Sequence, residues 1–161
     1  MAPLDVFDAG RMAVAQDPTG AAFGIWQAGE HHGSELANEP GSFTWSECQT
    51  RDVEAAETFY RAVFGYEVDT MPMGETASYR LLKVEGKNVA GMFELTPEMA
   101  GAPPSWATAF AVADTDATCK EAEELGAKVI VAPVDLPDIG CYAVLQDPVG
   151  AVFQVLANPA S

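Results

Sequence analysis

Ala132-Pro133-Val134-Asp135, followed eleven residues later by Gln146-Asp147-Pro148-Val149-Gly150-Ala151-Val152-Phe153, is the stretch of sequence that decides the fold. The chain carries almost the same stretch at its start, from Ala2-Pro3-Leu4-Asp5 to Gln16-Asp17-Pro18-Thr19-Gly20-Ala21-Ala22-Phe23. The two copies lie 130 residues apart without a gap, and thirteen of their twenty-two aligned positions are identical. A repeat at a fixed spacing indicates an architecture built from duplicated units.

Each copy predicts two strands joined by a tight turn. In Asp17-Pro18-Thr19-Gly20, the proline presets φ for the second turn position and the glycine closes the turn, so we expect a hairpin over residues 10–27. We interpret residues 1–27 as the last strands of a truncated first domain and residues 28–41, rich in polar residues and glycine, as a linker. A complete domain is expected over residues 42–158.

A second, shorter period lies inside that domain. Its first half predicts a helix between Asp52, as N-cap, and Gly65, as the left-handed C-terminal residue; its second half predicts a helix between Asp114 and Gly126. A strand precedes each helix and three strands follow it, so each half reads β-α-β-β-β. The expected strands cover residues 43–48, 66–70, 78–84 and 88–95 in the first half, and 107–113, 128–132, 142–146 and 152–156 in the second. The predicted fold class is therefore α+β, with an extra N-terminal hairpin.

Composition limits the function classes. The formal net charge of −16 argues against binding to nucleic acid or to an anionic membrane surface, because both carry negative charge. No apolar run reaches the length of about 20 residues that a membrane-spanning helix needs. Cys48, Cys119 and Cys141 are widely spaced and show no metal-binding or disulfide pattern, so we expect reduced thiols and a cytoplasmic protein.

The paired β-α-β-β-β order, with Asp-Pro-x-Gly between its last two strands, resembles the vicinal oxygen chelate superfamily, which includes glyoxalase I, bleomycin-resistance proteins and extradiol dioxygenases. The resemblance covers nearly the whole chain and implies paired modules that form a curved mixed sheet. More narrowly, the chain is similar to the second half of two-domain glyoxalase-like proteins. The residues that carry these resemblances are 50–60, 63–66, 112–117 and 147–150 for the superfamily, and 24–28 and 38–41 for the two-domain proteins.

The resemblance also implies a bowl-shaped site that holds a divalent metal, such as Zn, Ni, Mn or Fe, with one ligand from each of four strands. In this sequence the first ligand position is Trp45, which cannot bind metal, although Glu47 lies two residues further on. Glu94 occupies the second position and Gln154 the fourth, while the third falls at Ala107, which has no donor atom. We therefore expect a degenerate metal site and no resident cofactor, with Glu47, Glu94 and Gln154 as the ligands of the metal-dependent alternative.

Without a metal, the bowl remains a pocket for a small organic molecule. We expect its binding residues to be Trp45, Tyr79, Met92, Tyr142 and Gln154, with Trp45 as a stacking surface for a planar ligand. Glu47 and Glu94 are the candidate catalytic residues, because two carboxylates close together in an apolar bowl would raise the pKa of one of them. Cys48 is expected to face the helices, opposite Trp45, and to serve in packing.

Three functions remain open from the sequence. The first is a glyoxalase-like protein that binds or transforms a small molecule without a metal. The second is a metal-dependent lyase, isomerase or dioxygenase of the glyoxalase type, and the third is a non-catalytic oligomerisation module. We also expect a homodimer that pairs through the N-terminal strands, because these strands lack the sheet that would cover their edge.

Overall fold

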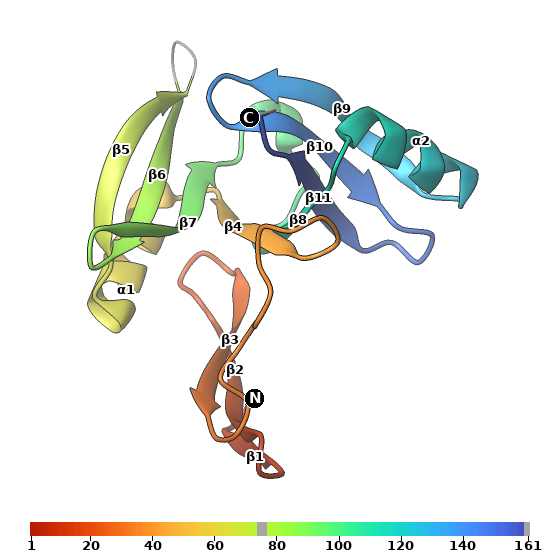
Figure 1. Ribbon diagram of the computed structural model, residues 1–161. Coiled ribbons are helices and arrows are strands. Elements are labelled where there is room, and N and C mark those ends of the chain that lie inside the picture. The colour runs from red at the N-terminus through yellow and green to blue at the C-terminus, as the bar shows by residue number, and fades with distance from the viewer. Residues whose placement is uncertain (74–76, 160–161) are drawn as a thin grey trace. The chain divides into compact units, whose positions relative to one another are not determined.

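The computed structural model describes residues 1–73 and 77–159, and it divides into two compact units. Unit 1 comprises residues 1–34 and 46–106, and unit 2 comprises residues 35–45 and the chain from Ala107 on. Within the described residues the chain forms eleven strands, two α-helices and one short 3-10 helix (Figure 1). Among these same residues, no helix combines the length and the apolar character needed to cross a membrane.

Unit 1 contains a three-stranded antiparallel sheet and a β-α-β-β-β module. The three-stranded sheet has the order β1-β2-β3, formed by Leu4–Val6, Gly10–Gln16 and Ala22–Ala28. In the module, β5, β6 and β7 form an antiparallel meander, and β7 pairs in parallel with β4 from Glu47 to Thr50. The module consists of β4 (Phe43–Thr50), α1 (Val53–Phe64), β5 (Glu67–Met73), β6 (Ala77–Val84) and β7 (Lys87–Glu94), followed by the 3-10 helix η1 (Pro97–Met99).

Unit 2 repeats the same arrangement. Its strand order is β8-β11-β10-β9, in which β9, β10 and β11 form an antiparallel meander and β11 pairs in parallel with β8. The elements are β8 (Ser105–Ala111), α2 (Thr115–Glu124), β9 (Lys128–Leu136), β10 (Gly140–Gln146) and β11 (Val152–Ala157). The predicted α+β fold of paired modules with an extra N-terminal hairpin is therefore confirmed.

The helices begin where the sequence predicts. The carboxylate of Asp52 accepts a hydrogen bond from the Ala55 amide, and that of Asp114 accepts one from the Ala117 amide, so both aspartates are N-caps. Gly65 ends α1 with φ of 70°, in the left-handed region that favours glycine. In the second half α2 ends at Glu124, two residues before Gly126, whose φ is 93°.

Two of the strands that extend past their predicted ends contain a proline. β9 continues to Leu136 and β5 to Met73, although each contains a proline, Pro133 and Pro72. Both strands lie at an edge of their unit's sheet. On the open side of an edge strand no neighbouring strand needs an N–H donor, so a proline there breaks no hydrogen bond of the sheet. The ends predicted from the sequence are residues 70 and 132, before each proline.

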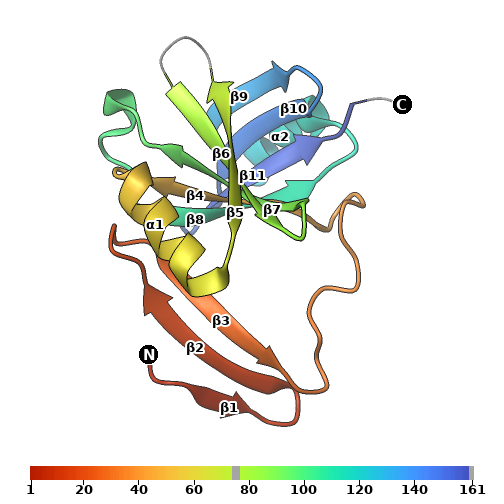
Figure 2. The ribbon, with the colours of Figure 1, turned by 90° about the vertical axis from the view of Figure 1, so that its left-hand side faces the viewer.

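The core of unit 1 lies on one face of its module sheet, under α1. The helix buries Val53, Ala56 and Tyr60 in one cluster with Cys48 and Met92. Phe23 of β3 packs on the same helix, with its ring edge-on to Phe59 and Phe64 at centroid distances of 5.9 Å in both cases. The N-terminal sheet is thus attached to α1 (Figure 2).

The two copies of the Asp-Pro-x-Gly turn form the same local hydrogen bonds. Oδ1 of Asp17 accepts from the amides of Thr19 and Ala21. Oδ1 of Asp147 accepts from the amides of Val149 and Ala151. Their surroundings differ, because Asp17 is only 5% exposed whereas Asp147 is half-buried.

Candidate functional site

Glu47 and Tyr79 form a hydrogen-bonded pair on the face of the unit 1 sheet that lies opposite α1. The Tyr79 hydroxyl donates to Oε1 of Glu47 at 2.7 Å. The two residues come from β4 and β6, and β7 lies between these strands. Register brings them together, because Gly91 of β7 is the partner of Glu47 and Phe93 of β7 is the partner of Tyr79.

The position of Tyr79 is fixed by its two neighbours on β7. A Cβ atom on Gly91 would overlap the Tyr79 hydroxyl, so the tyrosine lies across the glycine and uses the space that a side chain would fill. The Phe93 ring stacks beside it at a centroid distance of 6.5 Å and an interplanar angle of 18°. The face therefore carries two stacked aromatic rings with a carboxylate at their edge; Glu47 and Tyr79 are half-buried, whereas Phe93 is only 9% exposed.

Met92 and Glu94 lie on the other face of this sheet. Successive strand residues point to opposite faces, and Met92 is fully buried in the core against α1 together with Cys48. This placement does not agree with the expectation that Met92 is a binding residue of the pocket. By the same alternation Glu94 belongs to the α1 side, where it is exposed, so the structure does not bring it together with Glu47. The hypothesis of two mutually repelling carboxylates therefore has no geometric support within unit 1.

Cys48 packs as expected. It is completely buried, and burial raises the pKa of its thiol to about 12; the negative charge of Asp17 acts in the same direction, whereas a hydrogen bond with Tyr60 opposes it. A thiol that stays protonated is a poor nucleophile. This residue is therefore structural.

Unit 2 carries the other three predicted residues. Gln154 is 1% exposed, and its Nε2 donates to the Tyr142 hydroxyl at 3.1 Å. Their strands are direct neighbours, with Gln154 of β11 paired to Val144 of β10. Trp45 is half-buried in the part of β4 that belongs to this unit. Each unit therefore brings together one predicted pair, and a pocket that uses residues of both stays a prediction.

The divalent metal that the resemblance implies does not fit the donor atoms found within unit 1. Of the predicted ligands in unit 1, Glu47 belongs to the face opposite α1, whereas alternation along β7 puts Glu94 on the α1 side. Across residues 1–73 and 77–159, no three His, Cys, Asp or Glu side chains gather closely enough to hold a metal ion.

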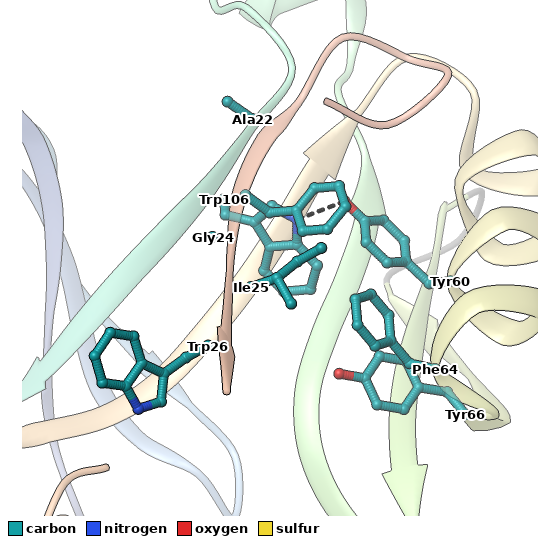
Figure 3. Close-up of a pocket in the computed structure, with 9 residues that line it drawn as sticks. Ala22, Gly24, Ile25, Trp26, Tyr60, Phe64, Tyr66 and Trp106 are labelled. Carbon is teal, nitrogen blue, oxygen red and sulfur yellow. Dashed lines mark hydrogen bonds between the residues drawn. The ribbon is translucent and has the colours of Figure 1, made fainter. Parts of the chain in front are cut away.

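Sequence reasoning missed an aromatic cavity of about 460 Å³ in unit 1, between β3 and α1 (Figure 3). Trp106 Nε1 donates to the Tyr60 hydroxyl at 2.7 Å, and this hydroxyl in turn donates to Oδ2 of Asp17 at 2.9 Å. Burial raises the pKa of Tyr60 above its ordinary value, so the phenol remains a donor. From the sequence, Asp17 was predicted only as a turn residue, and no local pattern pointed to a contact with Tyr60. The cavity is lined by Ala22, Phe23, Gly24, Ile25, Trp26, Tyr60, Phe64, Tyr66 and Trp106.

The paired β-α-β-β-β modules, each closed by a parallel strand pair, are the arrangement of the glyoxalase fold. A profile of the Glyoxalase/Bleomycin resistance protein/Dioxygenase superfamily matches residues 42–155, and the chain belongs to this superfamily. The resemblance that the sequence suggested is therefore confirmed.

Curated relatives match nearly the whole chain. The protein named "Putative glyoxylase CFP32" of Mycobacterium tuberculosis (strain CDC 1551 / Oshkosh) is 45% identical over 156 residues, which cover 97% of this chain and 59% of that protein. "Anthracycline biosynthesis protein DnrV" of Streptomyces peucetius is 44% identical over 158 residues, which cover 97% of this chain and 56% of that protein. The chain thus spans somewhat more than half the length of these relatives.

Solved structures show the same fold at low sequence identity. The 2,3-dioxygenase LapB from Pseudomonas sp. KL28 matches with a TM-score of 0.60 and 12% identity, over 96% of this chain and 60% of that one. A single-residue variant of Streptomyces coelicolor methylmalonyl-CoA epimerase, in complex with 2-nitronate-propionyl-CoA, matches with a TM-score of 0.55 and 23% identity, over 73% of this chain and 97% of that one. At these identities the matches establish the fold and leave the activity open.

Proposed function

We propose that the chain binds a planar aromatic small molecule on the Glu47–Tyr79 face without a resident metal. We also propose that it transforms those ligands that are suitable substrates. The observation that carries this proposal is the 2.7 Å hydrogen bond between Tyr79 and Glu47, built over Gly91 and beside Phe93. The stacked rings offer a flat apolar surface, and the carboxylate and phenol at its edge offer an acceptor and a donor.

The chemistry that suits this pair is proton transfer to or from a ligand. The carboxylate of Glu47 has a second oxygen besides the one that accepts from Tyr79, and this oxygen can accept a phenolic proton or a proton next to a carbonyl. The Tyr79 hydroxyl holds the carboxylate in one orientation, so it acts here as a positioning residue. Trp45, Tyr142 and Gln154 are proposed as further contacts of the ligand.

The ligand class is supported by the relatives. A 44% identical protein is named for anthracycline biosynthesis, and anthracyclines are flat polycyclic aromatic compounds with phenol and quinone oxygens. A flat ring system could stack on Tyr79 and Phe93, while its edge oxygens hydrogen-bond to Glu47. We also propose a reducing compartment such as the cytoplasm, which the three free cysteines support.

Titration of chelator-treated protein with a hydroxylated anthraquinone, followed by calorimetry and ligand fluorescence, tests this function. We expect saturable binding that Glu47→Gln and Tyr79→Phe each weaken about tenfold, the effect of losing roughly 1.4 kcal/mol. Tyr66→Phe is the matched control, because it removes a tyrosine hydroxyl at the aromatic cavity, away from the Glu47–Tyr79 face, and should leave the affinity unchanged. Binding that requires added Zn, Ni, Mn or Fe would favour the metal-dependent alternative, and no binding would favour the non-catalytic one.

A further inference from the structure

The edge of β3 faces the aromatic cavity of unit 1. Among the strands of residues 1–73 and 77–159, β3 pairs only with β2, so its second edge has none of these strands beside it. Five consecutive residues from Ala22 to Trp26 line the cavity, although alternate residues of a strand point to opposite faces. The cavity therefore runs along the backbone edge of β3, with Tyr60, Phe64, Tyr66 and Trp106 as its opposite wall (Figure 3). We call this feature the β3 groove.

The second copy of the repeat shows what lies beside the equivalent edge. At the 130-residue offset, β3 corresponds to β11, and β1 and β2 correspond to the end of β9 and to β10. In unit 2 the outer edge of β11 is occupied by β8, which runs parallel to it with Gln154 opposite Ala109 and Leu156 opposite Ala111. The Leu156 carbonyl accepts from the Val112 amide at 3.0 Å, so this carbonyl points to the outer edge.

The outward groups of β3 follow from this correspondence. Trp26 is equivalent to Leu156 and Gly24 to Gln154, and the N–H and C=O of one strand residue point to the same side. The backbone groups of Gly24 and Trp26 therefore point into the groove, whereas those of Phe23 and Ile25 point to β2.

The edge is also sterically accessible and uncharged. A Cβ on Gly24 would meet no atom within 4 Å, and the Trp26 indole is held back over Gly10 of β2 by a hydrogen bond of 2.9 Å from its Nε1 to the His31 carbonyl. From Ala22 to Ala28 the strand has no charged residue, proline or bulge, which are the features that usually protect an edge strand.

We propose that the β3 groove binds an extended segment of another polypeptide, which adds to the sheet parallel to β3 as β8 adds to β11. The segment would be short and uncharged, with small and apolar side chains like those of Ser105–Ala111. Basic residues after it would complement Asp8 and Glu30, which are joined by a backbone hydrogen bond just beyond the end of β3. A second copy of the chain, which the sequence suggested, is the competing occupant; a two-fold pair of β3 strands would be antiparallel, unlike the β8–β11 arrangement.

A peptide with the sequence Ser105–Ala111, a fluorescent label and three C-terminal lysines tests this proposal by anisotropy. A scrambled peptide with the same label and tail measures binding through charge alone. We expect the β8-sequence peptide to bind at least tenfold more tightly than the scrambled one. Equal binding of both peptides would overturn the proposal.

Two substitutions at one position locate the binding site. Gly24→Pro removes an outward N–H and leaves the β2-facing groups in place, so we expect at least tenfold weaker binding. Gly24→Ala keeps the N–H and fits the open space, so we expect unchanged binding. If Gly24→Pro binds as the parent chain does, the edge is not the site. If Gly24→Pro does not fold, N-methylation of alternate peptide amides supplies the test on the parent chain, and unchanged binding would again overturn the proposal.

Self-association is measured in parallel by light scattering on the peptide-free protein. A monomer agrees with the proposed occupant. A dimer that Gly24→Pro dissociates and Gly24→Ala preserves would show that the occupant is a second copy and would overturn the proposal. Because Gly24 lines the aromatic cavity, which does not include Glu47 or Tyr79, failure here would leave the anthraquinone titration unaffected.

Discussion

The Tyr60 hydroxyl donates a hydrogen bond of 2.9 Å to Oδ2 of Asp17, which lies 43 residues earlier in the chain. This bond joins α1 to the turn between β2 and β3, inside the core of unit 1. The buried carboxylate is further stabilised by the amides of Thr19 and Ala21 and by the Thr19 hydroxyl. The N-terminal sheet is thereby attached to α1 through polar bonds as well as through Phe23.

Substitution of this aspartate is expected to be costly. Asp17→Ala should lower the free energy of unfolding by about 2–4 kcal/mol, because it leaves the Tyr60 hydroxyl and two turn amides without their acceptor in a buried place. Asp147→Ala breaks the same local turn bonds at a half-buried site and should cost about 1 kcal/mol. Urea unfolding of the two variants measures the difference. Equal losses would mean that the bond to Tyr60 contributes nothing.

Stability should fall in alkaline solution because of Cys48. The folded thiol has its pKa raised to about 12, whereas the unfolded thiol ionises near its ordinary value of 9.0. Between these values the unfolded state binds fewer protons, so stability is fully present below pH 9 and is lost as the pH rises, by at most about 1.4 kcal/mol per pH unit. Tyr60 adds to the loss above its ordinary pKa of 10.0. In urea unfolding between pH 7 and 10.5, Cys48→Ala should show a shallower decline; the same slope in both proteins would exclude this origin.

Gly91 should not tolerate a side chain. Gly91→Ala places a Cβ on the Tyr79 hydroxyl and should destabilise the fold by about 1–3 kcal/mol, as overpacking does elsewhere. Gly101→Ala is the control, since a Cβ there meets no atom within 4 Å. Chemical unfolding gives both values. In a Tyr79→Ala background the cost of Gly91→Ala should largely disappear, and two strictly additive losses would contradict the overlap.

Arg80 should contribute more to stability than an exposed arginine does. Its side chain is 12% exposed and pairs with Glu57 at 3.1 Å and with Glu54 at 3.3 Å, both on α1. Arg80→Ala should cost about 1.5–3 kcal/mol, because its bond to Glu57 joins two charged groups that are both largely desolvated, whereas Glu54 is 74% exposed and adds little. Arg11→Ala removes the exposed pair with Asp5 and should cost less than about 1 kcal/mol. Thermal and urea unfolding compare them, and similar losses would contradict this ranking.

The sequence predicted those features that depend on local rules. Asp52, Gly65 and Asp114 were identified from cap chemistry, which needs only the few residues around each helix end. The repeat predicted the order of helices and strands along the chain, because a repeat can be recognised from the sequence alone. The position of Cys48 in the core followed from alternation along its strand, which puts it on the face opposite Trp45.

The candidate site was harder to predict, because it depends on strand register. Glu47 and Tyr79 were each named as candidates, but their hydrogen bond requires β7 to align Gly91 with one and Phe93 with the other. Glu94 was placed by its resemblance to a ligand position, and alternation along β7 puts it on the other face. The contact of Asp17 with Tyr60 depends on tertiary packing between distant segments, for which no local pattern exists.

The parallel pairs β4–β7 and β8–β11 determine the order in which the chain can fold. The antiparallel meanders β5-β6-β7 and β9-β10-β11 pair strands that follow one another directly in the sequence, so closing them costs little chain entropy. Each parallel pair instead joins strands separated by a helix and two further strands. We therefore expect the meanders to form early and the two parallel pairs to form late, in the slow step of folding. In pulse-labelling hydrogen exchange, the amides between β4 and β7 would then gain protection after those between β5 and β6.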